Sequence, residues 1–143
     1  MNEACVVGFG MIDALGDNPI TCWENMINDQ DFHRPIDKFL HGDHGIKIST
    51  GFYPDADIDE EVTPRTVYYG LYSVEQALRM ANLPQSSNVG VVFSTLTGGN
   101  STKTLVNADG RKLKPKQVLK SALDHLCSQI SMQYGYTGIN TCI

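Results

Sequence analysis

The chain has 143 residues, a formal net charge of −5 and 41% hydrophobic residues. This length suits one domain with its own core, and the composition is ordinary for a soluble globular protein. The negative charge argues against nucleic-acid binding through phosphates, and no apolar stretch reaches the roughly 20 residues of a membrane span. We therefore expect neither a nucleic-acid partner nor a membrane partner.

The N-terminus and the cysteines favour a cytoplasmic protein. No basic segment followed by an apolar one, as in a secretory signal, opens the chain. The cysteines form no C-x-x-C pair, so neither a zinc ribbon nor a thioredoxin-like site is indicated. We expect all of them to be reduced thiols. They are Cys5, Cys22, Cys127 and Cys142.

The first predicted element is a short apolar strand over residues 4–16 that runs into glycines. Gly8 and Gly10 hint at a dinucleotide-binding fingerprint, but Asp13 stands where the third glycine is required. A nucleotide-binding domain is therefore a minor alternative. A helix follows, for which Asn18 is a suitable cap and Pro19 a suitable first residue. Its residues Ile20, Trp23 and Ile27 fall on one face.

Residues 29–62 form a loop-rich excursion with many turn residues, and we expect short strands around residues 46–52. His41 and His44 have no further ligands at the spacing of a metal site. The aspartates near residue 57 follow calcium-loop spacing, but Glu60 replaces the required glycine. We expect no metal site.

The second half alternates helices and strands. An amphipathic helix over residues 63–83 carries a buried stripe that includes Val67, Leu71 and Val74. Residues 88–95 form a strand without polar alternation, which suits a sheet covered on both faces. A helix after Pro115 continues to Gly135, and a final strand follows it. This order predicts a layered α/β fold with a mixed or parallel sheet.

In chain order these segments resemble the N-terminal part of the β-ketoacyl-acyl carrier protein synthases, the thiolase-fold condensing enzymes. The similar stretches are "VVGFGMIDALG", "CWENMIND", "PRTVYYGLYSVEQALRMANL", "NVGVVFSTLTGGNST" and "RKLKPKQVLKSALDHLCSQISMQYGYTG". The resemblance covers nearly the whole chain. It implies that residues 1–143 are the incomplete first half of a thiolase-like layered α/β fold, with a mixed sheet and covering helices.

The resemblance assigns three scaffold or substrate-pocket residues, Arg65, Gly98 and Gly99. It places the family's reactive cysteine beyond Ile143, so Cys142 is expected to be a strand residue. The competing interpretation makes Cys142 the nucleophile of a shortened loop. In the family that nucleophile opens a buried helix, whose dipole and N–H groups favour the thiolate, and only Ile143 follows Cys142. We therefore name no catalytic residue with conviction.

The implied function is that of an N-terminal portion of a β-ketoacyl synthase, an acyltransferase of fatty-acid or polyketide synthesis, inactive by itself. The alternative is a chain-length-factor-like, non-catalytic partner of a ketosynthase. No cofactor is expected. The expected partners are an acyl carrier protein and the rest of the synthase or a ketosynthase subunit, in a homodimer or heterodimer. A basic stretch is a candidate carrier-docking patch, with Lys112, Lys114 and Lys116 as its proposed contacts.

Overall fold

The structure is a computed structural model of residues 1–143. It describes residues 3–29, 31–35, 50–51, 54, 56–59, 62–82, 86–95, 115–120 and 122–143. The elements in chain order are α1 (Pro19–Ile27), β1 (Arg34–Pro35), β2 (Thr50–Gly51), α2 (Arg65–Ala81), β3 (Val91–Phe93), α4 (Pro115–Lys120), α5 (His125–Tyr134) and β4 (Asn140–Cys142).

The strands form two small sheets. β1 and β2 pair antiparallel, whereas β3 and β4 pair parallel, with Val92 opposite Thr141. The predicted α/β class is therefore confirmed in its coarse form. The expected layered mixed sheet, the half of a thiolase-like fold, is not what the described residues show: each of these sheets has two strands.

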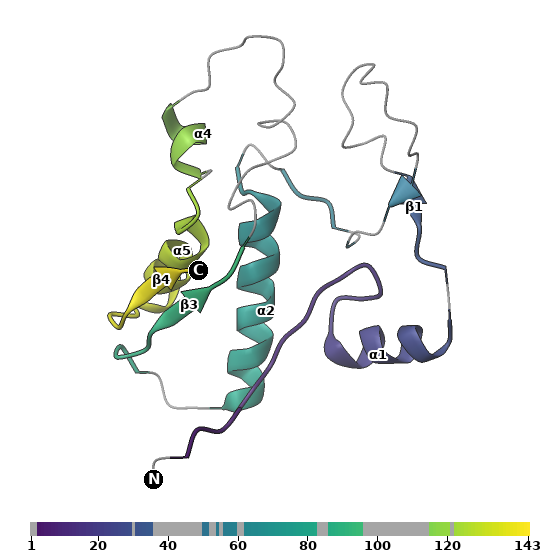
Figure 1. The fold of residues 1–143 in the computed structure, drawn as a ribbon, viewed down its shortest axis with the longest axis horizontal. Coiled ribbons are helices and arrows are strands. Elements are labelled where there is room, and N and C mark those ends of the chain that lie inside the picture. Colours follow the sequence, from purple (N-terminus) through teal and green to yellow (C-terminus); the bar gives the residue numbers. More distant parts are fainter. Residues whose placement is uncertain are drawn as a thin grey trace.

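The core lies where α5 packs on α2 on one side and on the β3–β4 pair on the other (Figure 1). Its centre is buried and consists of Val67 from α2 and Leu126 and Ile130 from α5. Val91 and Phe93 of β3 pack against this cluster. The predicted buried stripe of α2 is thus confirmed at Val67, and Leu71 and Val74 also pack against the cluster.

Helix ends follow the predicted capping chemistry at two places. Asn18 has extended backbone and accepts a hydrogen bond from the Thr21 N–H, and Pro19 is the first residue of α1. Gly135 ends α5 in the left-handed conformation, with φ of 67°. Both helix ends were expected from the sequence.

The predicted single helix after Pro115 is wrong, because the structure divides it into α4 and α5. Between them Ala122 N–H donates to Leu119 O, and His125 N–H donates to Ala122 O. These three-residue spacings mark a tight turn that breaks the α-helical ladder. As a consequence Leu126 and Ile130 are buried, whereas Leu119 and Leu123, expected on the same face, are 71% and 55% exposed.

The predicted first strand is also wrong. Residues 4–12 contain no strand, and they run as an extended segment across α2 (Figure 1). Gln76 of α2 occupies backbone groups that a neighbouring strand would use. Its Oε1 accepts from the Met11 N–H, and its Nε2 donates to Met11 O, each at 3.2 Å. The glycine at position 10 permits this approach, because a Cβ there would clash with the backbone carbonyl of Ser73.

We predict that Gly10→Ala destabilises the chain by about 1–3 kcal/mol, since the added methyl group must push the segment away from a helix backbone that cannot yield. The urea midpoint of unfolding, followed by circular dichroism, measures the effect.

Gly90→Ala is the matched control, because its Cβ would lie 3.2 Å from the nearest atom, the carbonyl oxygen of Ile139. A small shift relieves that contact, so the midpoint should change less. Equal losses in the two variants would contradict the close approach of residue 10 to α2.

Candidate functional site

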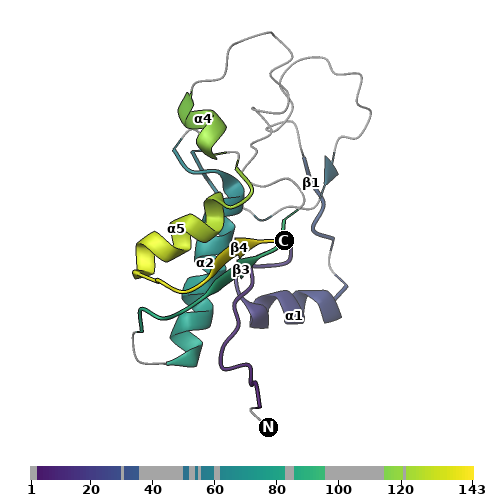
Figure 2. The ribbon, with the colours of Figure 1, turned by 60° about the vertical axis from the view of Figure 1, so that its left-hand side comes forward.

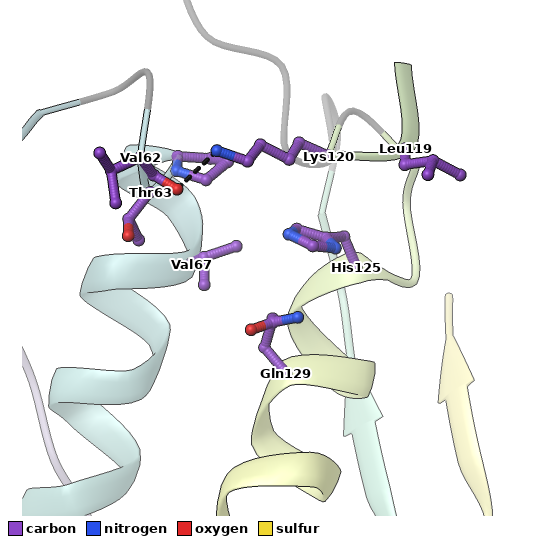
Figure 3. A pocket seen from close by; sticks show the side chains of 8 residues that line it. Val62, Thr63, Val67, Leu119, Lys120, His125 and Gln129 are labelled. Carbon is purple, nitrogen blue, oxygen red and sulfur yellow. Dashed lines mark hydrogen bonds between the residues drawn. The ribbon is translucent and has the colours of Figure 1, made fainter. Parts of the chain in front are cut away.

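A cavity of about 350 Å³ lies between the beginning of α2 and the α4–α5 junction (Figure 3). The start of α2 and the residues before it form one wall, and the end of α4 and the first turns of α5 form the other. Its lining residues are Val62, Thr63, Pro64, Val67, Leu119, Lys120, His125 and Gln129. Two segments that lie far apart in the sequence therefore build one site.

Lys120 joins the two walls of this cavity. Its ammonium group donates a hydrogen bond to Val62 O at 2.5 Å, across the mouth shown in Figure 3. The bond ties the last residue of α4 to the loop that leads into α2. It also holds a positive charge beside the cavity, where an anion would be attracted.

His125 is the first residue of α5 and is half-buried in the same cavity. Removal from water, together with the charge of Lys120, lowers the pKa of its imidazole below the ordinary value, and the charge of Asp124 opposes this shift. A lowered pKa favours the neutral ring near pH 7. A neutral ring can donate one hydrogen bond and accept another.

The cavity therefore offers an ammonium, an imidazole, the Gln129 amide and the Thr63 hydroxyl beside apolar side chains. This combination suits a small ligand that has an anionic or hydrogen-bonding head and an apolar body. Within the part of the chain that the structure describes, no group of three or more potential ligands could hold a metal ion.

Two thiols lie in surroundings that suppress the thiolate. Burial, with the Asp13 carboxylate next in importance, raises the pKa of Cys22 to about 11. Burial also raises the pKa of Cys127, and the neighbouring Cys142 adds to this effect. Neither thiol is activated as a nucleophile, because the reactive form is the thiolate.

The structure gives the sequence-derived site residues separate positions. Arg65 opens α2 and donates to the Tyr69 hydroxyl at 3.1 Å and to Ala56 O at 3.5 Å, outside the cavity lining. Cys142 is a strand residue, as expected, and lies in β4 opposite Phe93. Lys116 belongs to α4. Gly98, Gly99, Lys112 and Lys114 lie outside the described residues, so their assigned roles stay predictions.

Sequence reasoning did not find the cavity. It expected His125 to be a partly buried helix residue, which is confirmed, and it counted Lys120 in a basic surface stretch. The signal that it lacked was the break between α4 and α5, which brings these two residues beside the start of α2. No periodicity in the sequence marks this break.

Comparison with known proteins gives a fold and no family. No protein-family model and no curated protein matches the chain. A solved structure does, with a TM-score of 0.70 and 14% sequence identity. Its title is "AntDE:AntF (apo): type II PKS acyl-carrier protein in complex with its ketosynthase bound to the hexaketide". The match covers 96% of this chain and 36% of the other, so the chain spans about a third of the length of the chain that it matches.

These findings correct the identification of the chain as an N-terminal β-ketoacyl synthase portion. The matched title is headed by an acyl-carrier protein, and a likeness at 14% identity carries the fold alone. The segments that suggested the synthases are a glycine turn, amphipathic helices and apolar strands, which recur throughout α/β proteins. The condensing activity and the chain-length-factor alternative are both withdrawn with that identification.

A search for membrane spans among the described residues finds no helix long and apolar enough to cross a bilayer.

We predict that Lys120→Met raises the pKa of His125 toward the ordinary value of about 6.5, because it removes a cationic neighbour that disfavours the imidazolium. The measurement is a titration of the His125 ring protons by NMR. Arg79→Met is the control, since Arg79 pairs with Glu75 on α2 and is not among the cavity-lining residues. An unchanged His125 pKa in Lys120→Met would contradict the arrangement.

The same lowered pKa fixes the sign of a stability effect. Between the folded and unfolded pKa values the unfolded chain binds more protons, so stability rises with pH. The contribution of His125 is fully present above about pH 6.5 and is lost as the pH falls through the folded value. We expect His125→Gln to flatten the dependence of the urea midpoint on pH just below 6.5. A dependence equal to that of the unaltered chain would contradict this prediction.

Proposed function

We propose that this chain is a protein-binding component of type II polyketide assembly and that its partner is a ketosynthase. The observation that carries the proposal is the fold likeness: 96% of the chain superposes on a chain from a type II polyketide carrier–ketosynthase complex. In that complex the function rests on contacts between proteins, and the proposal transfers this setting to the present chain.

The character of the described side chains supports binding in preference to covalent catalysis. Cys22 and Cys127 have raised pKa values, which disfavours nucleophilic attack by either thiol. Large apolar side chains are exposed on several elements, among them Trp23, Val92 and Ile139 at 63%, 65% and 79%. Such exposure is typical of surfaces that another protein covers.

The finer expectations belong to this proposal. An acyl carrier protein is the second partner that we propose, because the matched structure holds one bound to its ketosynthase. We also propose one continuous domain over residues 1–143, work in a heteromeric assembly and a cytoplasmic location. The four cysteines are free in the structure, which accords with a reducing compartment.

Binding to a purified type II ketosynthase tests the proposal. With the ketosynthase immobilised, biolayer interferometry should report a saturable response with Kd of about 1–100 μM, the range of transient interfaces. The sensor control is an immobilised protein of similar isoelectric point. A response no larger than that control at about 100 μM chain would overturn the proposal.

A second candidate function follows from the cavity beside Lys120 and His125. At about 350 Å³ it is near the lower limit of ligand pockets, so it would take a small ligand with an anionic head. We expect hexanoate to shift the backbone NMR signals of Lys120 and Gln129, and Lys120→Met to weaken that effect several-fold. Shifts of equal size with neutral hexanamide would show that the ammonium group does not select the ligand.

A further inference from the structure

Helix α1 has the reverse of the orientation that an amphipathic surface helix usually adopts. Its apolar residues Ile20, Trp23 and Ile27 share one face, as the sequence indicates, and they are 71%, 63% and 61% exposed. Figures 1 and 2 show α1 at the edge of the molecule, with no described helix or strand over this outer face. An amphipathic helix normally turns such a stripe toward the core.

The opposite face of α1 is fixed to the rest of the chain by specific contacts. Cys22 is 1% exposed, and its thiol donates to the Asp13 carboxylate at 3.2 Å. The Asn25 side-chain amide donates to Leu15 O at 2.6 Å. These contacts and the Asn18 cap set the rotation of the helix, so the outward position of the apolar stripe follows from the structure around it.

The charge of this region is strongly one-sided. No lysine or arginine precedes Arg34, whereas the same stretch holds six acidic residues, and the net charge of the entire chain is −5. Asp17, Glu24 and Asp29 are exposed in α1 or next to it. The acidic residues are Glu3, Asp13, Asp17, Glu24, Asp29 and Asp31.

We infer that the outward face of α1, formed by Ile20, Trp23, Glu24 and Ile27, is a docking surface for a partner protein that offers an apolar groove with a basic rim. An apolar helix stripe in a groove is a common mode of recognition, and a tryptophan often contributes a large share of such an interface. The acidic surroundings select a basic rim by charge complementarity. The inference rests on the proposed function in naming the ketosynthase as that partner.

A single fluorine signal can report this contact directly. Trp23 is the only tryptophan in the chain, so growth with 5-fluorotryptophan places one ¹⁹F label on the docking surface. Addition of unlabelled ketosynthase should shift and broaden that signal. The label is specific to this chain even when the partner contains tryptophans of its own.

Three variants separate the stripe from its charge. Trp23→Ala should raise Kd at least about tenfold, mainly through faster dissociation. Glu24→Lys should slow association and reduce its dependence on salt concentration. Met132→Ala is the control, since Met132 is equally exposed, at 67%, but lies on α5; its Kd should stay within twofold. Circular dichroism of each variant checks that α1 has kept its helix.

The possible results distinguish the two proposals. A ketosynthase that binds without moving the ¹⁹F signal, and with equal Kd for Trp23→Ala, overturns the docking surface and leaves the proposed function standing. The absence of any binding overturns both. A ¹⁹F signal that broadens with the concentration of the chain alone would identify a second copy as the occupant, and would overturn the partner named here.

Discussion

The packing of α5 is the constraint on which the rest of the structure depends. This helix contributes Leu126 and Ile130 to the buried cluster, with Val67 of α2 on one side and Val91 and Phe93 of β3 on the other. Because the same helix also covers β4, it holds the parallel strands together at a place where sequence-distant segments meet. The cavity depends on it as well, since His125 and Gln129 occupy the first turns of α5.

Local signals in the sequence predict the helix ends well and the long-range pairing less well. Asn18, Pro19 and Gly135 act through bonds within their own turns, so their roles can be inferred without a tertiary structure. The expected strand over residues 4–16 fails for a different reason. Its apolar residues suit a sheet, but Gln76, more than 60 positions away, occupies the backbone of Met11. Tertiary context overrides propensity here.

The candidate site was beyond the reach of sequence patterns for a related reason. Leu119, Leu123, Leu126 and Ile130 keep a regular helical spacing through the α4–α5 break. Periodicity therefore predicts one helix, although only the second pair is buried. The break turns the end of α4 toward Val62, where Lys120 forms its bond, and so creates a site that no motif marks.

The uncovered face of the β3–β4 pair argues for partnership independently of α1. Parallel strands are normally covered on both faces, because their connections place helices there. Here α5 covers the side of Val91 and Phe93. The exposed Val92, Ile139 and Ile143, at 65%, 79% and 77%, accord with an open opposite side. A protein that covers such surfaces in the folded chain and not in the unfolded one adds its binding free energy to stability. For this chain, folding and partner binding are therefore expected to be thermodynamically linked.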